Sequence, residues 1–467
     1  MPAKTARSPR APIRDGVAPL RVTYTRPLAR LYPTLDPTLY PTLEPALANP
    51  LRRRLLAAVA GLALTGGLVL PANAQTDTSP DDTVATRQHP DYDPAGIRMG
   101  GFILYPSITL DEVYDSNIYA TQGNDTSDLI TVLQPKLELK SNWNVHQLNL
   151  HASGDINWYA RNSRENYANY DIGGDGRVEI YHDAWIAGGA DYSLWHLPRT
   201  SPNNIVGQAD PTEYNQTSAN LVGHKEFGNL FVELGDSYNR YDFANAQTFD
   251  GRTILWERQN HDENEISVRT GYSIEGLYEL YVKGAYNTRN YDFTSDMSGF
   301  NRNSTGYTAV VGGKYNLTGI TSLDLFAGYR SQDYDDARLG TFSGPTGGAK
   351  VTWNVTTLTT VTGEITRDIN ETIVVGAAGY FGTRETLAVD HELLRNVQLH
   401  LQLSHEADDF QNIDRTDDVY GVGLGAKYMM SQMTALNVRY NYQIRSSNRT
   451  GIGYADHNIL VGLTLHM

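Results

Sequence analysis

The chain has 467 residues, with 42 glycines, 30 tyrosines and no cysteine, and its formal net charge is -15 at pH 7. A protein this acidic does not hold nucleic acid by neutralising phosphates, and without cysteine it forms neither a disulfide framework nor a lipid-modified N-terminal cysteine. Beyond residue 80, no stretch offers the ~20 apolar residues that a transmembrane helix requires. On composition alone, a soluble all-β protein is the leading interpretation.

Residues 1–74 are predicted to be an N-terminal extension followed by a secretory signal peptide. Three arginines at 52–54 precede an apolar run over 55–70, and Ala72 and Ala74 supply the Ala-x-Ala end after which cleavage is expected. The alternative is a short transmembrane anchor, but the apolar run is too short for one, and small residues of the kind found at cleavage sites follow it. Residues 1–50 are a proline-spaced, low-complexity segment, which a start codon assigned too far upstream or a long basic region before the apolar run would explain.

Removal of residues 1–74 makes the remaining chain more acidic. That segment holds ten Lys/Arg and three Asp/Glu, a net of +7, so the mature chain carries -15 - 7 = -22. Residues 75–98 are polar and rich in proline and aspartate, and we expect a disordered periplasmic lead-in there. The rest of the chain, residues 99–467, is expected to form one domain.

From about residue 100 onward, apolar and polar side chains alternate over segments of ten to sixteen residues. In 148–158 the even positions are apolar or small, and the odd positions are polar; 397–404 and 436–445 show the same alternation. A period of two indicates β-strands, because successive side chains leave opposite faces. The strands are expected at 100–114, 127–141, 144–160, 166–181, 184–197, 212–227, 229–243, 258–273, 277–291, 303–317, 321–333, 343–355, 358–369, 381–392, 396–409, 415–429, 433–446 and 456–467.

The connections between these strands alternate between short and long. Short ones fall at 142–143, 182–183, 228, 275–276, 318–320, 393–395 and 431–432, whereas 198–211 and 244–257 are typical of the longer set. Short periplasmic turns against long outer loops are typical of up-and-down membrane barrels, and a soluble sandwich with crossovers does not produce them. We therefore predict a closed antiparallel transmembrane β-barrel of about 18 strands, with 16 to 18 left open.

The last segment supports a barrel in the bacterial outer membrane. Its apolar side chains share one face up to the carboxy-terminus: Ile459, Val461, Leu463, Leu465 and Met467. Outer-membrane barrels end on such a strand, which the barrel-assembly machinery reads, although they usually end on Phe or Trp and Met467 departs from that. Tyrosines and tryptophans near the strand ends fit interfacial girdles, and aromatic residues also favour strands in general.

Residues 94–107 (PAGIRMGGFILYPS), followed by 114–119 (YDSNIY), resemble an outer-membrane barrel family. Pro135, Ser141-Asn142-Trp143 and His146 fit the same family, which is called putative beta-barrel porin 2 and is often encoded beside capsule and exopolysaccharide genes. The resemblance covers about 94–467. It implies a porin-like barrel that serves polysaccharide export, and it supplies no catalytic residues.

The polar face of each strand is expected to line an aqueous lumen. Residues predicted there include His151, Asp155, Glu279, Tyr281, Lys283, Asp324, His400 and Arg439. Several strands end in a cluster of Tyr, Arg and Asp, so that Arg161, Arg289, Arg330 and Arg445 are predicted near the outer mouth, with Tyr159 beside them. These arginines can bind carboxylates bidentately while tyrosines stack on sugars; alternatively, they pair with neighbouring aspartates or lipopolysaccharide phosphates.

The favoured function is an outer-membrane channel for an exopolysaccharide or capsular polysaccharide. It would work with a periplasmic and inner-membrane export system and would contact membrane lipid, lipopolysaccharide and the assembly machinery. The alternatives are a general or sugar-selective diffusion porin and, in another class, an outer-membrane hydrolase. No spacing singles out a catalytic set or a metal site, so we expect no enzyme activity and no cofactor.

Overall fold

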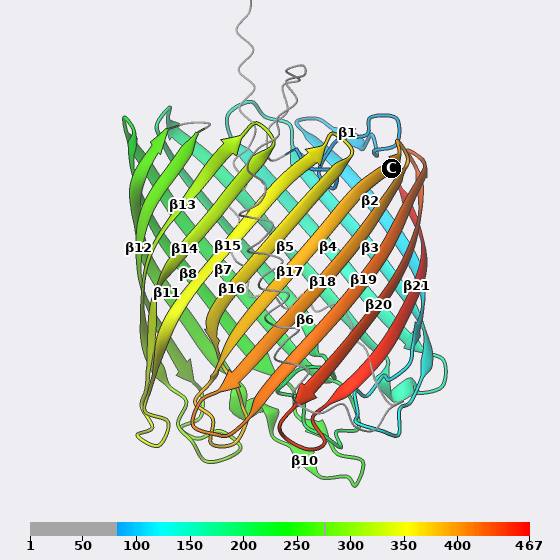
Figure 1. Ribbon diagram of the computed structural model, residues 1–467, viewed down its shortest axis with the longest axis vertical. Helices are drawn as coiled ribbons and strands as arrows, with labels where there is room; N and C mark the ends of the chain where they lie inside the picture. Colours follow the sequence, from blue (N-terminus) through cyan, green and yellow to red (C-terminus); the bar gives the residue numbers. More distant parts are fainter. Residues whose placement is uncertain (1–81, 275–276) are drawn as a thin grey trace, which may run out of the picture. The chain divides into compact units, whose positions relative to one another are not determined.

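The computed structural model describes residues 82–274 and 277–467, and in them one antiparallel sheet closes on itself (Figure 1). Each long strand pairs with the next along the chain, and the last pairs with the first from Ser107–His466 to Asp115–Asn458. Within the described residues the barrel has eighteen strands, as predicted. They are β2 (Phe102–Asp115), β3 (Asp128–Ser141), β4 (Gln147–Tyr159), β5 (Tyr167–Tyr181), β6 (Ala184–Leu197), β7 (Thr212–Phe227), β8 (Leu230–Phe243), β11 (His261–Ile274), β12 (Tyr278–Tyr291), β13 (Ser304–Thr318), β14 (Thr321–Tyr334), β15 (Thr341–Thr356), β16 (Thr359–Asn370), β17 (Tyr380–Leu394), β18 (Val397–Phe410), β19 (Thr416–Ser431), β20 (Thr434–Ser447) and β21 (Tyr454–His466).

The alternation of side chains sorts the barrel into an apolar outer face and a polar inner face. In β21, the side chains of Ile459, Val461, Leu463 and Leu465 are 45, 47, 42 and 48% exposed, whereas Asn458 on the other face is 1% exposed. An apolar side chain that stays exposed along a whole strand face is suited to lipid rather than to water. These four apolar side chains therefore share the outer face of β21, and the reading of this strand by the assembly machinery stays a prediction.

Short turns join the strands at one end, and long loops join them at the other, where β10 lies in Figure 1. The loop 244–260 holds two elements that the sequence analysis did not expect. One is a small hairpin of β9 (Ala246–Gln247) and β10 (Thr253–Ile254), and the other is the 3-10 helix η3 (Trp256–Gln259). A second 3-10 helix, η2 (Ser163–Glu165), lies between β4 and β5. These elements are too short for periodicity to show them.

Residues 82–99, the described part of the segment before the first barrel strand, differ from the disordered lead-in that was expected over 75–98. Val84 is 1% exposed, and its N–H donates to Thr360 Oγ1 (3.0 Å) on β16. His89 lies 3.4 Å from Glu392 on β17, and Gln432 donates to the carbonyl of Pro90 (2.8 Å). Strand β1 (Ile97–Met99) then pairs with the end of β2. Polar side chains do not prevent order here, because the rim offers complementary polar groups.

Several expectations concern residues outside the described part of the chain. These are the N-terminal extension, the signal peptide with Ala72 and Ala74, and the turn at 275–276. In the described residues, no helix has the length and hydrophobicity that a bilayer crossing requires.

Candidate functional site

The inner wall of β12 shows how the strands position side chains toward the lumen. Leu280 and Val282 point to the lipid side, 42 and 54% exposed. The odd-numbered positions of β12, which include Tyr281 and Arg289, lie on the opposite face. Asn287 on that face is 6% exposed. The predicted inward orientation of Tyr281 and Arg289 follows from the same period-two geometry.

The inner wall formed by β8, β11 and β12, which we call the paired wall, neutralises its charges locally. Arg269 donates to Glu233 (2.8 Å) and to Glu279, and its guanidinium stacks on Tyr281 at 4.2 Å. Lys283 donates to Glu265 (3.1 Å). Charge-assisted hydrogen bonds of this kind hold each side chain in one position. Tyr281, which was predicted to line the lumen, is thus engaged by an arginine of the wall.

The inner wall formed by β4, β5 and β6, which we call the acidic wall, is different. Asp155 accepts hydrogen bonds from the amides of Gln134 and Asn169, both at 3.3 Å. Asp175 accepts one from Asn149 at 2.9 Å. Because these donors are neutral, they orient the carboxylates without cancelling their charge. This wall therefore presents negative charge to the lumen.

The structure does not gather the four predicted arginines into one free group. Arg289 donates to Glu263 (2.7 Å) and to Glu371, and Arg330 donates to Asp368 (3.1 Å). Arg445 donates to the carbonyl of Thr200 at 2.5 Å. Arg161 follows β4 and is exposed. For Arg289 and Arg330, the geometry favours the interpretation in which the guanidinium pairs with a neighbouring acid.

Tyr159 lies on the inner face at the outer end of β4. It packs against the buried side chains of Val113, Ile130 and Val132, and its ring lies 6.5 Å from that of Tyr167. A stack of rings on the paired wall was not expected. His261 lies between Tyr241 and Tyr291, with ring centroids 4.8 and 4.6 Å away. The three residues are direct cross-strand neighbours, which only the register reveals.

Loops from nearly opposite sides of the barrel meet over the outer mouth. Asn203, in the β6–β7 loop, accepts a hydrogen bond from Thr372 (2.8 Å) in the β16–β17 loop. Arg302, 1% exposed, donates to Asp296 (2.6 Å) and to the carbonyl of Ala377 (3.3 Å). The loops therefore restrict the mouth through specific contacts.

These loops also share an apolar centre. Trp256, 1% exposed, packs with Ala246 and Ile254, and Leu197, Ile205, Phe243, Met297 and Ile373 surround them. At its edge, Arg199 donates to Glu165 at 2.6 and 3.0 Å. Burial raises the pKa of Glu165, and the hydrogen bond from Arg199 opposes that rise. Burial of apolar area and buried ion pairs together fix the loops in place.

Comparison with known proteins places the chain in a family. The family described as "Putative beta-barrel porin 2" matches residues 89–467. No curated protein matches. Among solved structures, the outer membrane protein OpdK from Pseudomonas aeruginosa is 12% identical, with 78% of this chain and 99% of that chain covered and a TM-score of 0.44.

Two further structures from Pseudomonas aeruginosa are similar at the same level. OccK2 (OpdF), solved in complex with glucuronate, is 12% identical over 78% of this chain and 98% of its own, with a TM-score of 0.44. The siderophore receptor PirA is 11% identical over 80% of this chain and 81% of its own, with a TM-score of 0.40. The family match covers most of the chain and agrees with the closed barrel. This chain belongs to the "Putative beta-barrel porin 2" family and is a porin-like channel of the outer membrane rather than an enzyme.

Proposed function

We propose that this channel carries an exopolysaccharide or capsular polysaccharide out across the outer membrane, together with a periplasmic and inner-membrane export system. The observation that supports this function best is the ring stack of Tyr241, His261 and Tyr291 on the inner wall. Because the three rings stack on one another, a sugar would contact their edges and the outer faces of the two tyrosines, which form a row of aromatic contacts along the wall. The family resemblance to proteins encoded near polysaccharide genes points the same way.

Polar groups beside this stack suit a hydrated polymer. Gln216 donates to the hydroxyl of Tyr241 at 3.4 Å, and the acidic wall lies along neighbouring strands. Amide and hydroxyl groups exchange hydrogen bonds with sugar hydroxyls at little cost, because both partners remain satisfied during passage. Such a wall favours sliding over tight binding.

A diffusion porin for small solutes is the second candidate, and the outer loops favour it. The contacts of Asn203 with Thr372 and of Arg302 with Ala377 restrict the mouth. A restriction held by a buried ion pair and an apolar centre suits small solutes better than a polymer, unless the loops open. The two functions predict different losses in a cell without the protein: loss of polymer secretion for an export channel, and slower uptake of small solutes for a diffusion porin.

A deletion strain separates the two functions. We expect this strain to secrete almost no polymer, and a chain with both Tyr241→Ala and Tyr291→Ala to restore only part of the secretion. Tyr286→Ala with Tyr307→Ala is the matched control, because those rings also lie close together (5.1 Å) but on the lipid face. It should restore secretion fully. Normal polymer secretion by the deletion strain, with slower uptake of small sugars, would reject export in favour of diffusion.

A further inference from the structure

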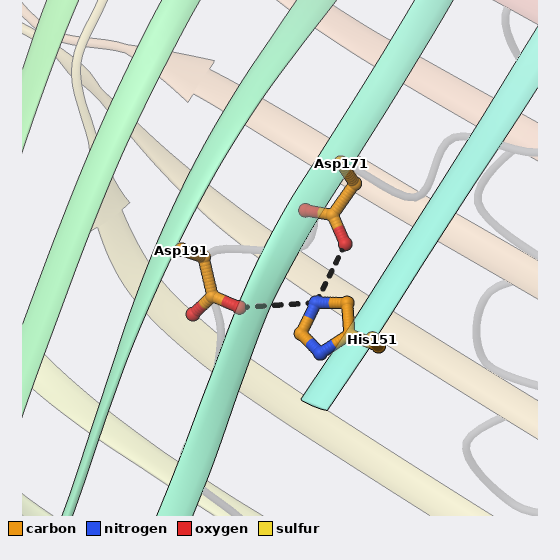
Figure 2. Close-up of side chains that lie close together, drawn as sticks. All are labelled: His151, Asp171 and Asp191. Carbon is orange, nitrogen blue, oxygen red and sulfur yellow. Dashed lines mark ion pairs between the residues drawn. The ribbon is translucent and has the colours of Figure 1, made fainter. Parts of the chain in front are cut away.

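Three side chains from neighbouring strands converge on the acidic wall: His151 on β4, Asp171 on β5 and Asp191 on β6 (Figure 2). His151 Nε2 lies 2.8 Å from Asp171 Oδ1 and 3.2 Å from Asp191 Oδ1. The ligand atoms all lie within 4.8 Å of one another. The side chains are 21, 16 and 24% exposed, so they are partly accessible from the lumen, although His151 Nε2 itself is buried.

The register and one glycine bring these residues together. His151 pairs with Gly173 on the next strand, and Gly173 pairs with Asp191 on the strand after that. His151, Gly173 and Asp191 therefore form one row across the sheet. A Cβ atom at position 173 would overlap Asp191 Oδ1. The glycine therefore leaves the space in which Asp191 and His151 approach each other over the backbone of β5.

Both carboxylates approach the same ring nitrogen, and this is what distinguishes the cluster. One nitrogen carries one proton or one lone pair, so a single N–H cannot donate well to two acids. His151 Nε2 is buried without a hydrogen bond of acceptable geometry, despite the two short distances. At His224, by contrast, Glu233 lies at Nδ1 (3.1 Å) and Glu226 at Nε2 (3.4 Å).

Neighbouring hydroxyls hold the second oxygen of each carboxylate. Ser193 donates to Asp171 Oδ2 (2.7 Å), and Ser218 lies in hydrogen-bond contact with Asp191 Oδ2 (3.4 Å). In each aspartate, Oδ1 is the oxygen that lies near His151 Nε2. Outer hydrogen bonds that orient ligating carboxylates in this way are characteristic of metal sites.

We propose that His151, Asp171 and Asp191 bind a divalent transition-metal ion of the Zn²⁺ or Mn²⁺ kind on the lumen wall. With ligands about 2.0–2.2 Å from such an ion, neighbouring ligand atoms lie about 3.0–3.5 Å apart, close to the two distances from His151 Nε2. One imidazole and two carboxylates suit these ions better than Ca²⁺, which takes six to eight oxygens. The remaining coordination positions face the lumen, where water or a solute carboxylate can complete them.

The proposal is tested by titrating the purified, folded full-length channel with Zn²⁺ and measuring binding by calorimetry and single-channel current in planar bilayers. We expect one class of site, and a current that changes with occupancy. His151→Gln and Asp191→Asn should each abolish both Zn²⁺ binding and the change in current. Ser193→Ala should weaken Zn²⁺ binding about 10–100-fold. Ser193→Ala keeps all three ligands, so it remains informative if a ligand variant fails to assemble.

His224→Gln is the matched control, because it removes a lumen histidine with two acidic neighbours at separate nitrogens. It should leave Zn²⁺ affinity unchanged. Equal Zn²⁺ affinity in the wild-type channel, His151→Gln and Asp191→Asn would overturn the proposal, as would a wild-type channel that binds no Zn²⁺. These measurements use the isolated channel, so their outcome does not depend on whether a polysaccharide is the solute.

Discussion

The acidic wall and the paired wall are built from similar strands but treat charge in opposite ways. On the paired wall, Arg269 and Lys283 each contact a carboxylate of a neighbouring strand. On the acidic wall, Asp155 and Asp175 are held by neutral amides. A charge that is paired stabilises the barrel locally, whereas a charge held by neutral donors still acts on ions in the lumen. The comparison separates structural charges from those that act on solutes.

The largest effect is expected from a test of which side chains face the lipid and which face the lumen, since the comparison of the two walls depends on that assignment. Arginine in place of Val461 or Leu463 puts a charge on the lipid face, at a cost of about 2–4 kcal/mol each near the bilayer midplane. Assembly should fail, as measured by the loss of heat-modifiable protein from the outer membrane. Thr464→Arg is the control on the adjacent inward position and should assemble. Equal assembly of all three variants would contradict the assigned faces.

The next effect tests whether charges of the paired type are structural. Arg289→Gln leaves Glu263 and Glu371 without their shared cation, and breaking a buried pair from one side costs about 3–5 kcal/mol. The temperature at which the folded band disappears on a gel should fall. Arg161→Gln changes an exposed arginine and should not shift it. If Arg161→Gln lowered the unfolding temperature and Arg289→Gln did not, the structural role assigned to Arg289 would be wrong.

A smaller effect is expected on ion selectivity. Asp155→Asn with Asp175→Asn removes two negative charges from the acidic wall while keeping amide hydrogen bonds possible, so the unfolding temperature should hold. The preference for cations should fall, by up to about thirtyfold for the two charges together if each contributes at most about 1 kcal/mol in water. Reversal potentials across a salt gradient measure this change.

The control for that experiment removes a neutral pair from the other wall. Glu265→Gln with Lys283→Gln leaves the net charge unchanged, so the reversal potential should stay where it is in the wild type. A shift as large as that of the aspartate variant would show that the two walls do not differ in their action on ions.

The smallest effect needs no substitution. The screening length is about 10 Å at 0.1 M salt and about 3 Å at 1 M, so distant wall charges lose influence as salt rises. Cation preference of the wild-type channel should therefore decline between these concentrations. A preference that is independent of salt would point to contact binding of ions instead.

Much of the fold could be predicted because a barrel strand carries its own pattern. The spacing of side chains such as Leu463 and Leu465 predicts which face of the sheet they occupy, and the short turns indicate the topology. The inward positions of Arg289, Arg330 and Arg445 also followed from alternation. Their partners did not, since Glu371 and Thr200 lie in loops whose path has no period.

The proposed metal site was not predicted from the sequence for a related reason. His151 could be placed on the inner wall, but its meeting with Asp171 and Asp191 depends on the pairing of three strands. No short motif encodes a row that crosses a sheet, so a search for local ligand spacing finds no metal site. Gly173, which makes room for the cluster, resembles the other glycines of a glycine-rich chain.

The segment before the barrel has a consequence for the order of assembly. Val84 contacts Thr360, and Pro90 contacts Gln432, at sequence separations of 276 and 342 residues. These contacts cannot form until the strands near the end of the chain are in place. We therefore expect residues 82–99, which we call the latch, to dock only after these strands have formed. The latch lies across the seam at which β2 meets β21, because β1 covers the part of β2 that β21 leaves unpaired.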